Sequence, residues 1–219
     1  MSEAVQAIAR TADRVRALAR ERLAPSLSLA DLNAAGQSKV GDFALNDPPP
    51  YSALAGARPA AVLAPIVARS DGLNVILTLR TAHLRAHSGQ IAFPGGKLDP
   101  GEAPIDAALR EAREEIGLEK RLIEPLGWLD PYLTGTGYRV APLVALIDPA
   151  FQPSLNAHEV VEVFETPLAF LMDPANHKLD QREWQGRVRR FYAMPHEGRY
   201  IWGATAGILR NLYERLFLR

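Results

Sequence analysis

The chain has 219 residues, of which 47% are apolar, and its 25 Lys and Arg residues are balanced by 25 Asp and Glu residues. This apolar share is typical of a globular protein with a sizeable core, and a net charge of zero argues against a protein that coats nucleic acid, which needs a basic excess. The absence of cysteine excludes disulfides, thiolate nucleophiles and Cys-rich zinc sites.

The amino-terminal region is predicted to be a helical arm. Apolar residues recur at helical spacing over residues 3–23, and Pro25 marks the end of that pattern. The stretch from Pro25 to Pro59 reads as irregular. We therefore expect residues 1–57 to form a helix and linker that pack on a main domain of residues 58–219, or the helix to dock on a second subunit of a homodimer.

The main domain is predicted to alternate strands with helices. Two strands, 60–69 and 73–80, flank the hairpin signal Ser70-Asp71-Gly72. A helix follows Pro104 and ends at Gly117. Further along come strands at 122–132 and 138–147, a strand-to-helix segment at 160–172 opened by Pro167, a polar strand pair around 183–194 and a helix at 204–218. This order predicts an α/β sandwich around a mixed β-sheet.

The helix predicted over residues 104–116 carries an unusual set of charges. Ile105, Leu109, Ala112 and Ile116 fall within one arc and are expected to face the core. Glu111, Glu114 and Glu115 cluster on another face, where Ala107 and Ala108 are expected to leave space above them.

Three carboxylates at this spacing repel one another, and they lie near the carboxyl end of the helix, where the helix dipole disfavours negative charge. Violations of two local rules at one place are typical of a functional site. Carboxylate oxygens are the ligands preferred by Mg²⁺ and Mn²⁺, so the sequence predicts a site for one of these cations.

The surrounding residues resemble a known motif. Gly96, then five residues, Glu102, then seven residues, and Arg110-Glu-Ala-Arg-Glu-Glu-Ile-Gly-Leu118 match the Nudix box at every defining position. The resemblance implies a Nudix α/β/α sandwich and Mg²⁺-dependent hydrolysis of a nucleoside diphosphate joined to another group.

The resemblance also implies roles for individual residues. Glu111 and Glu115 are the expected principal metal ligands, with Glu114 a further ligand or a water-mediated contact, and Arg110 is expected to fork onto a neighbouring carboxylate. Gly95 and Gly96 let the backbone approach the metal or the phosphate, and Glu102 braces the corner between loop and helix. Glu159 is the candidate general base, with Glu162 in reserve.

Upstream, Ile76-Leu-Thr-Leu-Arg80-Thr81, Arg85, Gly89 and Phe93-Pro-Gly-Gly96 resemble the signature of the coenzyme A pyrophosphatase branch of this family, with Ile76 and Thr81 as conservative departures. The resemblance implies cleavage of coenzyme A to 3′,5′-ADP and 4′-phosphopantetheine. Arg80, Arg85, His87 and Lys97 are candidate contacts for the substrate phosphates. Local ion pairing is the alternative role for Arg80 and Arg85.

Two other functions stay open at this point: a pyrophosphatase acting on ADP-ribose or dinucleotides, and a non-catalytic Nudix module that binds a nucleotide to regulate a partner. The amino end, Met-Ser-Glu-Ala, has no apolar signal region, and no apolar run approaches the roughly 18 residues of a membrane helix. A cytoplasmic protein that binds neither membrane nor nucleic acid is expected.

Overall fold

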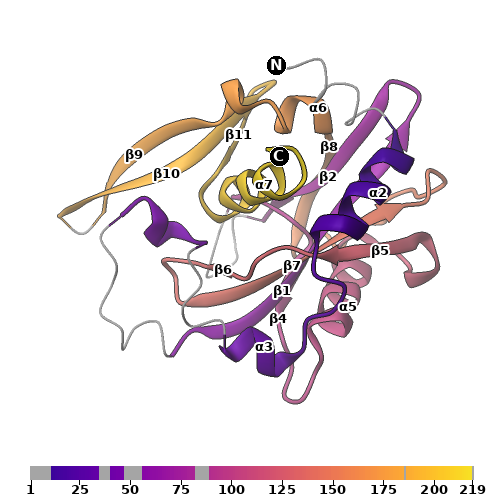
Figure 1. Ribbon diagram of the computed structural model, residues 1–219, viewed down its shortest axis with the longest axis horizontal. Coiled ribbons are helices and arrows are strands. Elements are labelled where there is room, and N and C mark those ends of the chain that lie inside the picture. The colour runs from indigo at the N-terminus through magenta and orange to yellow at the C-terminus, as the bar shows by residue number, and fades with distance from the viewer. Residues whose placement is uncertain (1–10, 35–39, 47–55, 82–88, 185, 219) are drawn as a thin grey trace.

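A computed structural model describes residues 11–34, 40–46, 56–81, 89–184 and 186–218 (Figure 1). Its larger sheet has eight strands in the described part of the chain. They are β1 (Arg58–Arg69), β2 (Gly72–Arg80), β3 (Ile91–Ala92), β4 (Gly95–Lys97), β5 (Ile123–Trp128), β6 (Tyr132–Leu133), β7 (Tyr138–Ile147) and β8 (Val160–Pro167).

The larger sheet is mixed. Its main path runs β3-β2-β1-β7-β5, while β4, β6 and β8 pair with β1, β7 and β2 respectively. The long central pair β1–β7 is parallel, and the remaining pairs are antiparallel. The predicted mixed sheet and the predicted hairpin between β1 and β2 are therefore confirmed.

The two central strands are apolar between their ends because both faces of the sheet are covered. In β1, Leu63 and Val67 face one layer of core, whereas Ala64 and Ile66 face the other. The first layer lies under helix α5 (Pro104–Ile116). The second lies under helices α2 (Ala12–Arg22) and α7 (Gly203–Leu216), and Figure 1 shows α7 on the opposite side of the sheet from α5.

A second sheet lies beside α7. Its strands are β9 (Lys178–Trp184), β10 (Arg187–His196) and β11 (Arg199–Trp202), in the order β11-β10-β9. Thr205, in the first turn of α7, donates a hydrogen bond from its hydroxyl to the Ile91 carbonyl, so the start of α7 is tied to β3 of the larger sheet. Helix α6 (Leu168–Leu171) follows β8 directly, and Pro167 is its cap as predicted.

The described residues between Pro25 and Pro59, namely 25–34, 40–46 and 56–59, contain more regular structure than the sequence predicted. It contains helix α3 (Leu29–Ala34) and the 3₁₀ turn η1 (Asp42–Ala44). The Ser28 hydroxyl accepts a hydrogen bond from the Asp31 N–H and donates one to the Asp31 carboxylate, which begins α3. The prediction of an irregular segment was wrong because this short cap was not recognised.

The amino-terminal helix packs on its own chain. Val15 and Ala19 of α2 are fully buried in the same cluster as α7, and Arg16 forms a two-bonded contact with Glu124 of β5 at 2.7 and 2.9 Å. Of the predicted helix 3–23, residues 3–10 lie outside the described part. Two other predicted elements have different bounds in the structure. The strand predicted over 122–132 is divided into β5 and β6, and the polar strand pair predicted around 183–194 begins earlier, at Lys178.

The burial of α3 generates a stability prediction. Leu32 has no exposed surface and packs in the cluster that includes Leu63 and Trp128. Leu32→Ala is expected to lower the free energy of unfolding by about 2–5 kcal/mol, because it removes buried methyl groups and leaves a cavity. Urea unfolding measures this. Leu218→Ala, at a side chain that is 57% exposed, is the control and should change the value by less than about 0.5 kcal/mol; equal effects of the two variants would contradict the packing of α3.

Candidate active site

Helix α5 begins and ends where the sequence predicted. Pro104 occupies its first turn, where a missing N–H costs nothing. Gly117 follows with φ 71°, and its N–H bonds to the carbonyls of Ala112 and Arg113, which closes the last turn. These two signals place Glu111, Glu114 and Glu115 in the last two turns of the helix.

The buried face of α5 agrees with the prediction at Leu109, Ala112 and Ile116, which are buried. It differs at Ile105, which is 37% exposed, and at Ala107 and Ala108, which have no exposed surface and therefore no open space above them. The face against β1 is made of small residues, chiefly Ala107, Ala108 and Ala112, which allow the helix to lie close to the strand. Glu115 lies on this same close-packed side.

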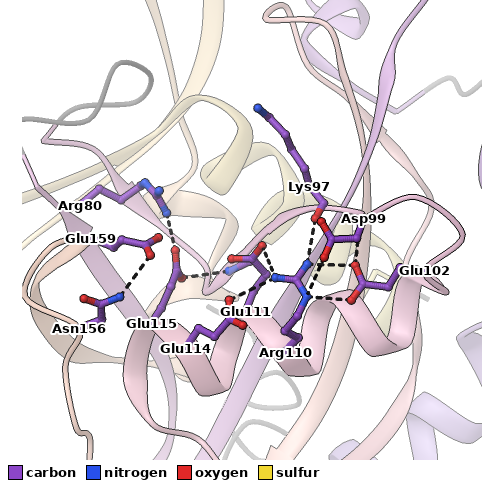
Figure 2. Close-up of polar contacts among 11 residues, drawn as sticks. Arg80, Lys97, Asp99, Glu102, Arg110, Glu111, Glu114, Glu115, Asn156 and Glu159 are labelled. Carbon is purple, nitrogen blue, oxygen red and sulfur yellow. Dashed lines mark hydrogen bonds and ion pairs between the residues drawn. The ribbon is translucent and has the colours of Figure 1, made fainter.

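The carboxylate of Glu115 is fully buried and held at both oxygens. Its Oε1 accepts a hydrogen bond from Arg80 Nη1 at 2.6 Å, and its Oε2 accepts one from the Gly95 N–H at 3.1 Å (Figure 2). Arg80 comes from the end of β2 and Gly95 from β4. The carboxylate is therefore fixed between the helix and the sheet.

Arg110 forks onto Glu102, as the motif implied. Its Nε and Nη2 donate to the two oxygens of Glu102 at 2.8 and 3.0 Å. Its Nη1 also donates to Glu111 at 2.9 Å and to Glu114 at 3.2 Å. Figure 2 shows the guanidinium between Glu102 and Glu111, so a single arginine orients three carboxylates.

The two glycines before the helix allow close approach. At Gly95, a Cβ atom would lie 2.5 Å from the Ala61 carbonyl oxygen, because β4 is pressed against β1. At Gly96, a Cβ atom would lie 2.5 Å from Cδ of Glu111. Any side chain at Gly96 would therefore occupy the space that the Glu111 carboxylate takes up.

Burial and charge shift the pKa values in opposite directions within the site. Burial raises the pKa of Glu115 to about 7, although Arg80 and the Gly95 N–H act to lower it. Burial also raises the pKa of Glu111, Arg110 opposes this, and the charges of Glu114 and Glu159 raise it further. The Arg110 hydrogen bonds lower the pKa of Glu102. The acids deepest in the site thus carry a charge that the protein stabilises incompletely.

Glu159 lies beside Glu115, on the loop that precedes β8. The Asn156 side-chain amide donates to Glu159 Oε1 at 3.2 Å (Figure 2). The same loop is anchored to the end of α5, since the Asn156 N–H bonds to the Glu115 carbonyl at 3.0 Å. Glu162, the reserve candidate, is paired instead with Arg199 of β11.

The candidate phosphate contacts occupy different surroundings. Arg80 is engaged with Glu115, which agrees with the alternative of local ion pairing. Lys97 is exposed, and in Figure 2 its side chain extends away from the carboxylates, while its carbonyl accepts a hydrogen bond from Arg110. Arg85 and His87 lie outside the described residues.

Sequence reasoning missed the pairing of Arg80 with Glu115 and the contact of Asn156 with Glu159. The first joins residues 35 positions apart, so no local pattern signals it. The second has a weak local signal, since an Asn three residues before an acid at a strand entrance can form a turn that orients that acid.

The donor set fits a divalent cation by its chemistry. Glu102, Glu111, Glu114, Glu115 and Glu159 supply five carboxylates around the two guanidinium groups of Arg80 and Arg110. Hard carboxylate oxygens in such excess are typical of Mg²⁺ and Mn²⁺ sites. Among the described residues, no three His, Asp or Glu side chains converge on one ion-sized point, because the carboxylates are turned toward the arginines.

Comparison with known proteins agrees with this arrangement. Residues 57–187 match the NUDIX domain. This chain belongs to the Nudix family. Its members are hydrolases of phosphoric anhydride bonds, in general with the help of divalent metal ions.

Named relatives are similar over most of their length. A protein of Yersinia enterocolitica named "Uncharacterized Nudix hydrolase NudL" is 38% identical over 81% of this chain and 91% of its own. A protein of the same name from Escherichia coli O7:K1 is 43% identical over 71% of this chain and 81% of its own.

The fold also resembles a solved structure. The Nudix hydrolase RenU of M. smegmatis aligns with a TM-score of 0.51 at 21% identity, covering 73% of this chain and 85% of that one. Together with the matched domain, this confirms the predicted Nudix sandwich. None of the described helices of this Nudix hydrolase has the length and apolar character needed to span a membrane.

The raised pKa of Glu115 predicts how the metal-free Nudix protein responds to pH. Between pH 4.5 and about 7 the native protein retains a proton on Glu115 that the unfolded chain has released. The free energy of unfolding should therefore fall as pH rises through this window, by up to about 3 kcal/mol from this group. Urea unfolding in EDTA at pH 5, 6, 7 and 8 measures the slope.

Glu115→Gln is expected to flatten that slope. Glu102→Gln is the matched control and should leave the slope unchanged. Because the pKa of Glu102 is lowered, the contribution of Glu102 to the free energy of unfolding is lost only as pH falls below about 4.5, outside the measured window. An unchanged slope in Glu115→Gln would contradict the burial of an ionisable Glu115.

Proposed function

We propose that this Nudix hydrolase cleaves the diphosphate of coenzyme A and its thioesters to 3′,5′-ADP and 4′-phosphopantetheine, with Mg²⁺ or Mn²⁺. The observation that supports this substrate is the position of the second signature, residues 76–96. Its described residues, 76–81 and 89–96, include the end of β2, β3 and the start of β4, and Arg80 and Gly95 both bond to Glu115 of the box helix. The described part of the segment typical of the coenzyme A branch therefore lies against the carboxylate cluster.

Glu111, Glu114 and Glu115 are the proposed ligands of the cation. When bound, such a cation supplies charge neutralisation of the diphosphate and lowers the pKa of a coordinated water. A carboxylate can accept at about four positions, so Glu111 and Glu115 could contact the ion without giving up their bonds to Arg110 and Arg80. Two further bonds from Arg110 to Glu102 brace the corner between β4 and α5.

Glu159 is the proposed general base. Asn156 holds its Oε1, and no described protein group donates a hydrogen bond to its Oε2, which can accept a proton from the attacking water. Gly96 leaves the space beside the Glu111 carboxylate free of a side chain, and Gly95 lets β4 lie close to β1. Lys97, exposed beside this approach, is the proposed contact for a substrate phosphate, together with Arg85.

A substrate panel tests the proposal. With Mg²⁺ or Mn²⁺, the protein is expected to release 4′-phosphopantetheine from coenzyme A faster than it cleaves dephospho-coenzyme A, ADP-ribose or a diadenosine polyphosphate. Chromatography of the products measures each rate. Preference for substrates without a 3′-phosphate would overturn the proposal in favour of an ADP-ribose or dinucleotide pyrophosphatase. Nucleotide binding without turnover would indicate a regulator.

Glu115→Gln is expected to lower kcat at least about 10²-fold, because it removes one of the charged groups proposed to hold the metal. The control is Glu165→Gln. The Glu165 carboxylate lies in β8 and not on the box helix, and it forms an ion pair with Arg69 at 2.6 Å, so this variant should retain wild-type activity. Near-normal turnover by a folded Glu115→Gln protein would refute the role assigned to Glu115.

Lys97→Ala is expected to raise KM for coenzyme A about tenfold and to change KM for dephospho-coenzyme A little. A charge-assisted contact to the 3′-phosphate would be lost only for the substrate that carries it. Steady-state kinetics with both substrates measures the difference, and Lys120→Ala, an exposed lysine beyond the carboxyl end of α5, is the control. Equal effects on the two substrates would contradict this contact.

A further inference from the structure

The end of β2 joins the two segments that carry acids of the site. Arg80 reaches the box helix through its bond to Glu115 at 2.6 Å. The next residue, Thr81, reaches the loop of Glu159: its N–H bonds to the Glu159 carbonyl at 3.0 Å and its hydroxyl to the His158 carbonyl at 3.1 Å. Two successive residues thus place both acids relative to the sheet.

Arg80 is the cation that compensates Glu115. The Glu115 side chain is 1% exposed and that of Arg80 is 18% exposed, so their contact is largely shielded from water. Among the described residues, the other donor to this carboxylate is the neutral Gly95 N–H. Removing one member of such a pair leaves the other charge uncompensated in a site that it cannot leave.

The loop of Glu159 is tied to the same carboxylate-bearing turn. The Ser154 N–H bonds to the Ile116 carbonyl at 2.9 Å, and the Asn156 N–H to that of Glu115 at 3.0 Å. Glu115 and Glu159 therefore belong to one hydrogen-bonded unit that β2 closes from the sheet side. A shift of Arg80 and Thr81 would disturb both acids together.

We propose that Arg80 is a positioning residue for Glu115 and not a contact for the substrate's phosphates. The proposal rests on the proposed function for its kinetic consequences. Arg80 and the Gly95 N–H hold the orientation of the Glu115 carboxylate, so that it would already be placed to serve as a ligand when a cation binds. Its guanidinium is used for this contact, so the discrimination of a 3′-phosphate falls to other cations.

The kinetic test separates these two roles. Arg80→Gln is expected to lower kcat about 10–100-fold, the range for losing a group that orients a metal ligand, and to leave KM within about threefold. The loss should be the same for coenzyme A and dephospho-coenzyme A. Arg80→Lys retains the charge without the planar fork and should recover part of kcat. A raised KM confined to coenzyme A, or no change in either constant, would overturn the proposal.

A double-mutant cycle shows whether Arg80 acts through Glu115. In a Glu115→Gln background, Arg80→Gln should change kcat less than about threefold, because the group that it positions is already gone. Additive losses would overturn the proposal. Arg69→Gln is the matched control. It breaks the ion pair between Arg69 of β1 and Glu165 of β8 and should leave kcat unchanged in both backgrounds.

Mn²⁺ binding gives a readout that requires no substrate. Titration followed by electron paramagnetic resonance should show Mn²⁺ affinity lowered about 10–100-fold by Arg80→Gln in the otherwise wild-type protein and less than threefold in the Glu115→Gln background. Unchanged affinity would overturn the proposal. If the wild-type protein hydrolyses no member of the panel, the proposed function fails while this cycle still decides the role of Arg80. Circular dichroism checks folding, and if Arg80→Gln does not fold, Arg80→Lys takes its place in every measurement.

Discussion

The site depends on a buried carboxylate, that of Glu115, whose positively charged partner comes from the sheet and not from its own helix. Glu115 lies on the close-packed side of α5, and its compensating charge, Arg80, comes from β2. A buried ion pair of this kind contributes little net stability, because desolvation offsets the attraction. What it provides is placement: the last turn of α5 can sit on the sheet only in the register where the Glu115 carboxylate meets Arg80 and the Gly95 N–H.

The small residues of the box segment make this placement sterically feasible. Ala107, Ala108 and Ala112 bring the helix axis close to β1, Gly95 lets β4 lie against β1, and Gly96 leaves room for the Glu111 carboxylate. Larger residues at these positions would overpack the contact and move the carboxylates away from the sheet edge. The apolar composition of the helix therefore serves the geometry of its charged face.

Local signals were sufficient to predict the elements that carry the site. Pro104 and Gly117 fixed both ends of α5 because a proline and a left-handed glycine have specific places in a helix, and β7 spans the predicted residues. The buried face was predicted correctly at Leu109, Ala112 and Ile116. It was predicted wrongly at Ile105, which hydrophobicity favoured over Ala107 and Ala108, whereas close packing favours the alanines. The Arg80–Glu115 pair could not be predicted, since it depends on the pairing of β2 within the sheet.

The two arginines of the site differ in a way that follows from their elements. Arg110 projects from α5 itself and contacts acids that precede it, adjoin it and follow it by one turn, so it moves with the helix and holds the box together. Arg80 belongs to the sheet, and its bond crosses from one layer to the other. An arginine within the helix can orient carboxylates relative to one another. An arginine on the strand orients them relative to the sheet, and with it to the loop of Glu159, which leads into the neighbouring strand β8. The relative position of ligand and base is what a metal-assisted hydrolysis requires.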